Sequence, residues 1–107
     1  MTTKAPNDPI LERFRASLRE IYGDRIERVV LYGSRARGDA RPDSDYDIAL
    51  FLKGPVDTWA EIKRIFPIEE QIRETFDADI STRPFPEGSW VKRTPLMHEI
   101  RKDGLDL

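Results

Sequence analysis

Two short apolar segments constrain the fold of this chain more than any other feature. Residues 26–32 (IERVVLY) and 46–52 (YDIALFL) are rich in β-branched and aromatic side chains, and a glycine follows each of them closely. Such segments are typical of β-strands. A pair of apolar strands is stable only when other elements cover it, so the rest of the chain must supply elements that pack against a sheet.

Helical patterns lie on both sides of these strands. Asp8 is a good N-cap residue, the proline after it suits the first helical position, and apolar residues then recur at helical spacing as far as Gly23. A second helix is predicted after Asp57, with Pro67 either kinking it or starting another helix. Residues 96–103 (LMHEIRKD) are predicted to form the last helix.

The order of these elements sets the fold class. Residues 76–82 (FDADIST) are predicted to be a short third strand, and residues 83–90, with two prolines and a glycine, a loop. The order helix, strand, strand, helix, strand, helix indicates an α/β or α+β domain with a small mixed sheet and helices packed on it. A chain of 107 residues is expected to form a single domain over residues 1–107, with residues 1–7 as a loose tail.

Composition excludes several classes of protein. The net charge of −2 and the pI near 5.4 argue against a general nucleic-acid-binding protein, which would be basic. No apolar stretch approaches the ~20 residues of a membrane helix, and the N-terminus lacks the apolar stretch of a secretory signal. The absence of cysteine excludes disulfides and thiolate chemistry and fits a reducing compartment, so we expect a cytoplasmic protein without membrane or nucleic-acid partners.

Two aspartates stand at the start of the second strand. Side chains alternate along a strand, so Asp45 and Asp47 point to the same face, with Cα atoms ~7 Å apart. Carboxylates this close repel each other unless a cation or a proton lies between them. A hard divalent metal satisfies the pair, and Mg²⁺ is commonly held by carboxylates together with substrate phosphates.

A glycine–serine turn follows the first strand. Gly33 permits close approach of a ligand to the backbone, and Ser34 is expected to cap a short helical turn whose N–H groups attract phosphate. Arg35, Arg37 and Arg41 add positive charge, and guanidinium groups match phosphate oxygens well. The sequence therefore predicts a triphosphate site beside the aspartate pair.

A two-metal site usually has a third carboxylate, and the predicted third strand offers two candidates. Asp77 and Asp79 are expected to share one face of that strand. We favour Asp79, because it lies between Ala78 and Ile80 within the apolar part of the segment, and we keep Asp77 as the alternative.

Other phosphate and metal motifs do not fit. Asp43, Asp45 and Asp47 alternate as in a calcium-binding loop, but Ile48 and Gly54 stand where that loop needs glycine and glutamate. The GSRARG segment is not followed by the lysine and hydroxyl residue of a Walker A loop.

The stretch 33–50 (GSRARGDARPDSDYDIAL) resembles the GSxxRG…SDxD signature of the DNA polymerase β-like nucleotidyltransferase superfamily. The small size and the element order are similar to those of the MNT-type minimal nucleotidyltransferases. This resemblance implies a palm-like nucleotidyltransferase fold and an antitoxin that neutralises a HEPN-type ribonuclease toxin. It further implies Mg²⁺-dependent transfer of AMP from ATP to a tyrosine hydroxyl of that toxin.

The resemblance also assigns roles to the residues named above. It implies that Asp45 and Asp47 bind Mg²⁺, that Gly33 and Ser34, with Arg37 nearby, hold the β- and γ-phosphates, and that Asp79 completes a second metal site or accepts the proton of the attacking hydroxyl. Two alternatives remain open. The chain could be a non-catalytic antitoxin that acts by direct binding, or an adenylyltransferase that modifies a small molecule.

Overall fold

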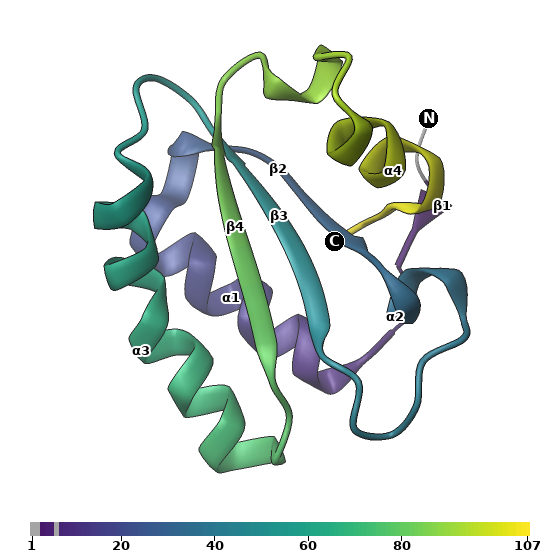
Figure 1. Cartoon of the computed structure of the whole chain (residues 1–107). Helices are drawn as coiled ribbons and strands as arrows, with labels where there is room; N and C mark the ends of the chain where they lie inside the picture. Colours follow the sequence, from purple (N-terminus) through teal and green to yellow (C-terminus); the bar gives the residue numbers. More distant parts are fainter. Residues whose placement is uncertain (1–2, 6) are drawn as a thin grey trace.

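The computed structural model describes the chain apart from residues 1, 2 and 6 (Figure 1). Its described residues form a five-stranded sheet with the strand order β1-β5-β2-β3-β4. The strands are β1 (Thr3–Lys4), β2 (Ile26–Tyr32), β3 (Tyr46–Leu52), β4 (Ile80–Pro86) and β5 (Leu105–Asp106). The predicted strands 26–32 and 46–52 are confirmed at both ends.

Three of the α-helices in the described chain begin within one residue of where the sequence predicts. The α-helices are α1 (Pro9–Tyr22), α2 (Ser34–Arg37), α3 (Thr58–Phe76) and α4 (Pro95–Asp103), and two 3₁₀ turns are η1 (Gly23–Arg25) and η2 (Ser89–Val91). The side chain of Asp8 accepts a hydrogen bond from the Ile10 N–H at 2.8 Å, and that of Thr94 accepts one from the Met97 N–H at 3.1 Å. These two caps satisfy N–H groups that the first turn of a helix leaves unpaired.

The sheet is mixed, as predicted. Strand β2 runs antiparallel to β3 and to β5, whereas β3 runs parallel to β4, and the long helix α3 makes the crossover between them. In this register Tyr46 pairs with Ile80 and Asp47 with Ser81. The N-terminal ends of β3 and β4 therefore lie side by side.

Helices cover both faces of the sheet. On one face α1 and α3 pack over Tyr46, Ile48, Leu50 and Leu52, which are all buried, so the predicted core face of the second strand is confirmed. On the other face α4 covers a second cluster, which contains Val30, Tyr32, Ala49, Phe51, Met97 and Ile100 (Figure 1). Polar groups of β2 and β3 therefore reach solvent mainly at the ends of these strands.

The prediction of the third strand is wrong in its limits. Helix α3 continues to Phe76 with Pro67 inside it, because its buried side chains Ile65, Ile68 and Ile72 form a continuous stripe against the sheet. Strand β4 begins only at Ile80 and extends through part of the predicted loop. It tolerates its prolines because it is the edge strand of the sheet, where a missing N–H donor breaks no ladder bond.

The expected tail is also wrong in part. Thr3–Lys4 forms β1, which pairs with β5, and the Ala5 N–H donates to the Asp106 carbonyl at 2.7 Å. Residues 1, 2 and 6 of that predicted tail lie outside the described residues. Among the residues that the structure describes, none of the helices is both long and apolar enough to span a bilayer.

Candidate functional site

The predicted site residues converge at one end of the sheet. Figure 1 shows that β2 ends where β3 and β4 begin. Gly33 directly follows β2, Asp45 and Asp47 lie at the start of β3, and Asp79 directly precedes β4. Antiparallel pairing of β2 with β3 and parallel pairing of β3 with β4 bring these positions together.

The closest approach within this group is between Gly33 and Asp47. Tyr32 and Asp47 are register partners in the β2–β3 ladder, so the residue after Tyr32 lies beside the Asp47 side chain. Gly33 has φ 76° and ψ −158°, and a Cβ built on it would collide with Oδ2 of Asp47. Only glycine fits this position, because the backbone conformation and the carboxylate each exclude a side chain.

The carboxyl group of Asp47 has a raised pKa. Partial burial raises its pKa above the ordinary value, and the negative charge of Asp45 raises the pKa further. The guanidinium groups of Arg83 and Arg37 lower the pKa, and Glu99 adds a smaller upward contribution. A cation between Asp45 and Asp47 would relieve this repulsion, so the pair fits a divalent metal such as Mg²⁺.

The serine of the glycine–serine turn does not cap the helix, contrary to expectation. Gly33 is the N-cap residue of α2, Ser34 is its first residue, and no side-chain hydrogen bond caps the turn. The Gly33 carbonyl accepts hydrogen bonds from the N–H groups of Ala36 and Arg37 at 3.1 and 3.0 Å. The Ser34 hydroxyl is therefore not used by the cap and is available to a ligand.

Arg37 lies at the site but is held by carboxylates. Its side chain pairs with Asp39 at 3.4 Å and with Glu99 of α4 at 3.8 Å. It remains 40 % exposed and is near enough to Asp47 to lower the pKa of that carboxyl group. Because these ion pairs are exposed to solvent, they contribute little to stability, and a phosphate could displace them.

Asp79 does not join the pair. Its Oδ1 accepts a hydrogen bond from Nε of Arg73 at 2.7 Å and forms an ion pair with the same guanidinium at 2.5 Å. Asp79 and Asp45 do border the same pocket, together with Phe66, Glu69, Glu70, Arg73 and Ile80. Within the described part of the chain, however, no three carboxylate or histidine side chains are close enough to hold one metal ion.

Asp77 is not a strand residue, contrary to the prediction. It is the C-cap residue of α3 and adopts a left-handed conformation with φ 54°. Asp77 and Asp79 both precede β4, so the expectation that they share one face of a strand is wrong. The strand begins one residue after Asp79 because α3 keeps its helical conformation as far as Phe76.

Two charged residues near Asp47 were not anticipated from the sequence. Arg83 on β4 is the register partner of Ala49, and Glu99 lies on α4, which covers the same face of the sheet. Both affect the pKa of Asp47. Arg83 would have been found if the third strand had been placed at residues 80–86, since the parallel register then sets it beside the second strand.

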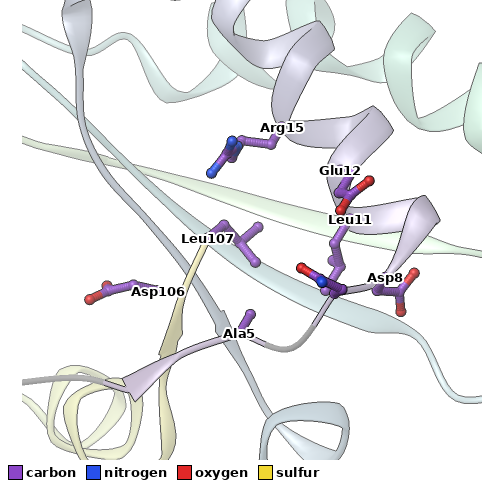
Figure 2. A pocket seen from close by; sticks show the side chains of 8 residues that line it. Ala5, Asp8, Leu11, Glu12, Arg15, Asp106 and Leu107 are labelled. Atoms are coloured by element: carbon purple, nitrogen blue, oxygen red, sulfur yellow. The ribbon is translucent and has the colours of Figure 1, made fainter.

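A separate pocket lies away from these residues. Figure 2 shows it between the segment before α1, the first half of α1 and the C-terminal end of the chain. Its lining residues are Ala5, Asn7, Asp8, Leu11, Glu12, Arg15, Asp106 and Leu107. None of the predicted site residues borders it, so it is not part of the candidate site.

The chain matches a known family over most of its length. Residues 11–96 match the family described as "Nucleotidyltransferase domain". A protein of Methanocaldococcus jannaschii, "Putative protein adenylyltransferase MJ0141", is 33% identical over 98 residues, which cover 92% of this chain and 95% of the relative.

Solved structures share the fold. A crystal structure of a toxin–antitoxin complex with AMP-PNP superposes with a TM-score of 0.61 at 21% identity, covering 89% of this chain and 70% of that chain. A complex of a tri-AMPylated Shewanella oneidensis HEPN toxin with an MNT antitoxin gives a TM-score of 0.52 at 16% identity, covering 91% and 70%. At these identities the comparison establishes the fold.

Proposed function

This chain belongs to the nucleotidyltransferase domain family, and we propose that it is a Mg²⁺-dependent protein adenylyltransferase that transfers AMP from ATP to a tyrosine hydroxyl of a HEPN-type toxin. The observation that carries this proposal is the carboxylate pair Asp45 and Asp47 beside the Gly33–Ser34 turn. A relative named as a protein adenylyltransferase and structural neighbours solved as toxin–antitoxin complexes support the choice of a protein acceptor.

In this proposal Asp45 and Asp47 hold Mg²⁺. When bound, the metal neutralises phosphate charge and favours departure of pyrophosphate. The raised pKa of Asp47 is consistent with this role, because ionised carboxylates that repel each other gain most from a bound cation.

The Gly33–Ser34 turn receives the β- and γ-phosphates. Gly33 lets the phosphates approach the backbone closely, and the Ser34 hydroxyl, unused by the helix cap, donates to a phosphate oxygen. Arg37 exchanges its exposed ion pairs for contact with the phosphates. These groups position the nucleotide, and positioning with charge neutralisation supplies most of the catalysis in reactions of this kind.

Transfer forms one bond to the α-phosphorus and breaks another, and it moves one proton. The tyrosine oxygen attacks the α-phosphorus, the bond from that phosphorus to the oxygen bridging to the β-phosphate breaks, and pyrophosphate leaves. The hydroxyl proton goes to Asp79, which must first leave Arg73. Because this ion pair is exposed to solvent, its separation costs little.

The proposal includes a cellular location and a domain organisation. We place the adenylyltransferase in the cytoplasm, where ATP and a ribonuclease toxin would both be found, and treat residues 1–107 as one domain. The family match over residues 11–96 supports the single domain.

The test is direct transfer to the partner. The protein is incubated with labelled ATP, Mg²⁺ and a candidate HEPN-type partner. The partner is then weighed, and its modified residue is located by mass spectrometry. Wild-type protein should add one or more adenylates to a tyrosine, whereas the variant with Asp45→Asn and Asp47→Asn should add none. A partner that stays unmodified would contradict the proposal.

One observation favours a second candidate function. Among the described residues, the ion pair with Arg73 holds Asp79 apart from Asp45 and Asp47, which favours an antitoxin that acts by contact alone. In that case the wild-type protein and the double variant would silence the toxin equally, and neither would modify it.

A further inference from the structure

Arg35 contacts the chain on both sides of Asp45. It lies in α2, directly after Ser34, and it is partly buried, whereas Asp45 is exposed and precedes the first residue of β3. We propose that Arg35 is a positioning residue that holds Asp45 in the metal-binding pair, and that it does not bind phosphate. This inference rests on the proposed function.

The first contact is with the loop before Asp45. Nε and one terminal nitrogen of Arg35 donate to the Ser44 carbonyl at 3.1 and 2.8 Å, and the same terminal nitrogen donates to the Pro42 carbonyl at 3.2 Å. Ser44 also closes the loop itself, because its Oγ accepts from the Arg41 N–H at 2.8 Å and its N–H donates to the Arg41 carbonyl at 3.0 Å. Arg35 therefore holds a compact turn that ends one residue before Asp45.

The second contact is with the residue after Asp45. The guanidinium of Arg35 stacks on the ring of Tyr46, with its central carbon 4.2 Å from the ring centroid. Tyr46 is buried, and its hydroxyl donates to Oδ2 of Asp8, the residue that caps α1. Arg35 thus connects the loop to a fixed point of the core as well as to α2.

The repulsion between Asp45 and Asp47 gives such a contact a function. Asp45 lies outside the β-ladder, and its repulsion from Asp47 favours conformations in which the two carboxylates separate when no cation is bound. Arg35 opposes that separation because it fixes residues 44 and 46 together. It also couples the two halves of the site, since Ser34 is its neighbour in the chain.

The same geometry argues against phosphate binding. Two of the three guanidinium nitrogens of Arg35 donate to main-chain carbonyls, and one face of the group lies over the ring of Tyr46. A side chain that binds phosphate needs its N–H donors directed to the nucleotide. Lysine would retain the charge, but it lacks the planar group that can donate to two carbonyls and stack on an aromatic ring at the same time.

The experiment compares Arg35→Lys and Arg35→Ala with Arg13→Ala, which removes an exposed arginine of α1 far from the loop in sequence. Two quantities are measured. Hydrogen exchange in the metal-free protein follows the Ser44 amide, which is hydrogen-bonded within the loop. Calorimetry gives the ATP affinity with Mg²⁺ and with EDTA.

We expect both Arg35 variants to accelerate exchange of the Ser44 amide. We also expect each to lose about 10- to 100-fold in the Mg²⁺-dependent part of the ATP affinity, as for residues that orient metal ligands. The ATP affinity of both Arg35 variants in EDTA should equal that of wild type. Arg13→Ala should match wild type in amide exchange and in ATP affinity. If Arg35→Lys exchanges its Ser44 amide and binds ATP with Mg²⁺ as wild type does, the inference is overturned. It is also overturned if Arg35→Ala loses ATP affinity in EDTA and Arg35→Lys restores that affinity, because Arg35 would then bind phosphate.

Failure of the proposed function gives a different result. If no adenylate is transferred to a partner but the Arg35 variants still free the loop and lose Mg²⁺-dependent ATP binding, the positioning role stands without the transferase activity. If transfer occurs and the variants leave exchange and metal dependence unchanged, the positioning role is wrong and the activity stands.

Discussion

The carboxylate of Asp47 lies against the backbone of Gly33, in the space that a side chain on residue 33 would occupy. This contact joins the end of β2 to the start of β3 and brings the predicted phosphate turn to the predicted metal ligand. The contact depends on the absence of a Cβ, so it gives the site a sharp mutational test.

Replacement of Gly33 by alanine should disable the site. The Cβ of Gly33→Ala would force the Asp47 carboxylate aside. The backbone conformation of residue 33 would also cost about 1–3 kcal/mol for any residue other than glycine. Gly38→Ala is the matched control, because Gly38 also has a positive φ of 85° but a Cβ there meets nothing within 4 Å. Thermal unfolding should show destabilisation in both variants, whereas calorimetry should show loss of Mg²⁺-dependent ATP binding in Gly33→Ala alone. Equal ATP binding by the two variants would contradict this placement.

Removal of both negative charges should separate metal binding from folding. The variant with Asp45→Asn and Asp47→Asn should lose the Mg²⁺-dependent part of its ATP affinity but should fold, because the substitution removes a repulsion. Mg²⁺ with ATP should raise the unfolding temperature of wild type and leave that of the double variant unchanged. An unfolded double variant, judged by circular dichroism, would show that the two aspartates are structural.

The stability of the metal-free protein should report the raised pKa of Asp47. A carboxyl group whose pKa is higher in the folded state than in the unfolded state destabilises the fold at pH values above its folded-state pKa. This cost disappears as the pH falls through the folded-state pKa towards the ordinary value of 3.8. Asp47→Asn should therefore be more stable than wild type at pH 7, and the difference should shrink as the pH is lowered through that window. Urea unfolding at several pH values checks this, and a difference that grows on acidification would refute it.

The role of Asp79 can be tested against that of Asp77. If Asp79 accepts the proton of the attacking hydroxyl, Asp79→Asn should lower the rate of transfer by about 100-fold or more. Asp77→Asn is the control, because asparagine tolerates the left-handed conformation of Asp77 and should leave the rate almost unchanged. Single-turnover transfer assays measure both rates. The reverse ranking of the two variants would identify Asp77 as the third carboxylate.

Arg73 offers a further test of the same carboxylate. Arg73→Ala removes the cation that holds Asp79, so it should make Asp79 available and keep or raise the transfer rate. The rate is measured in the same single-turnover assay. A fall in rate as large as that of Asp79→Asn would mean that Asp79 acts only as part of its ion pair with Arg73.

Local sequence signals determined the central elements of this protein. The starts of α1 and α4 follow from Asp8 and Thr94, because each side chain caps its helix through an N–H group two or three residues later in the chain. The limits of β2 and β3 follow from apolar runs bounded by turn residues. The contact of Gly33 with Asp47 was also within reach, because consecutive strands that pair antiparallel bring the end of the first beside the start of the second.

Only the tertiary structure decided where β4 begins and which charges surround the aspartates. Helix α3 extends past Pro67 because burial of its apolar stripe outweighs a local helix-breaking signal, and this extension places Asp77 and Asp79 before the strand. The contacts of Arg73 with the Asp79 carboxylate and of Arg35 with the Ser44 carbonyl depend on side-chain orientations that no local pattern encodes. Hydrogen bonds and ion pairs of this kind depend on where whole elements pack, and packing is set by burial across the chain.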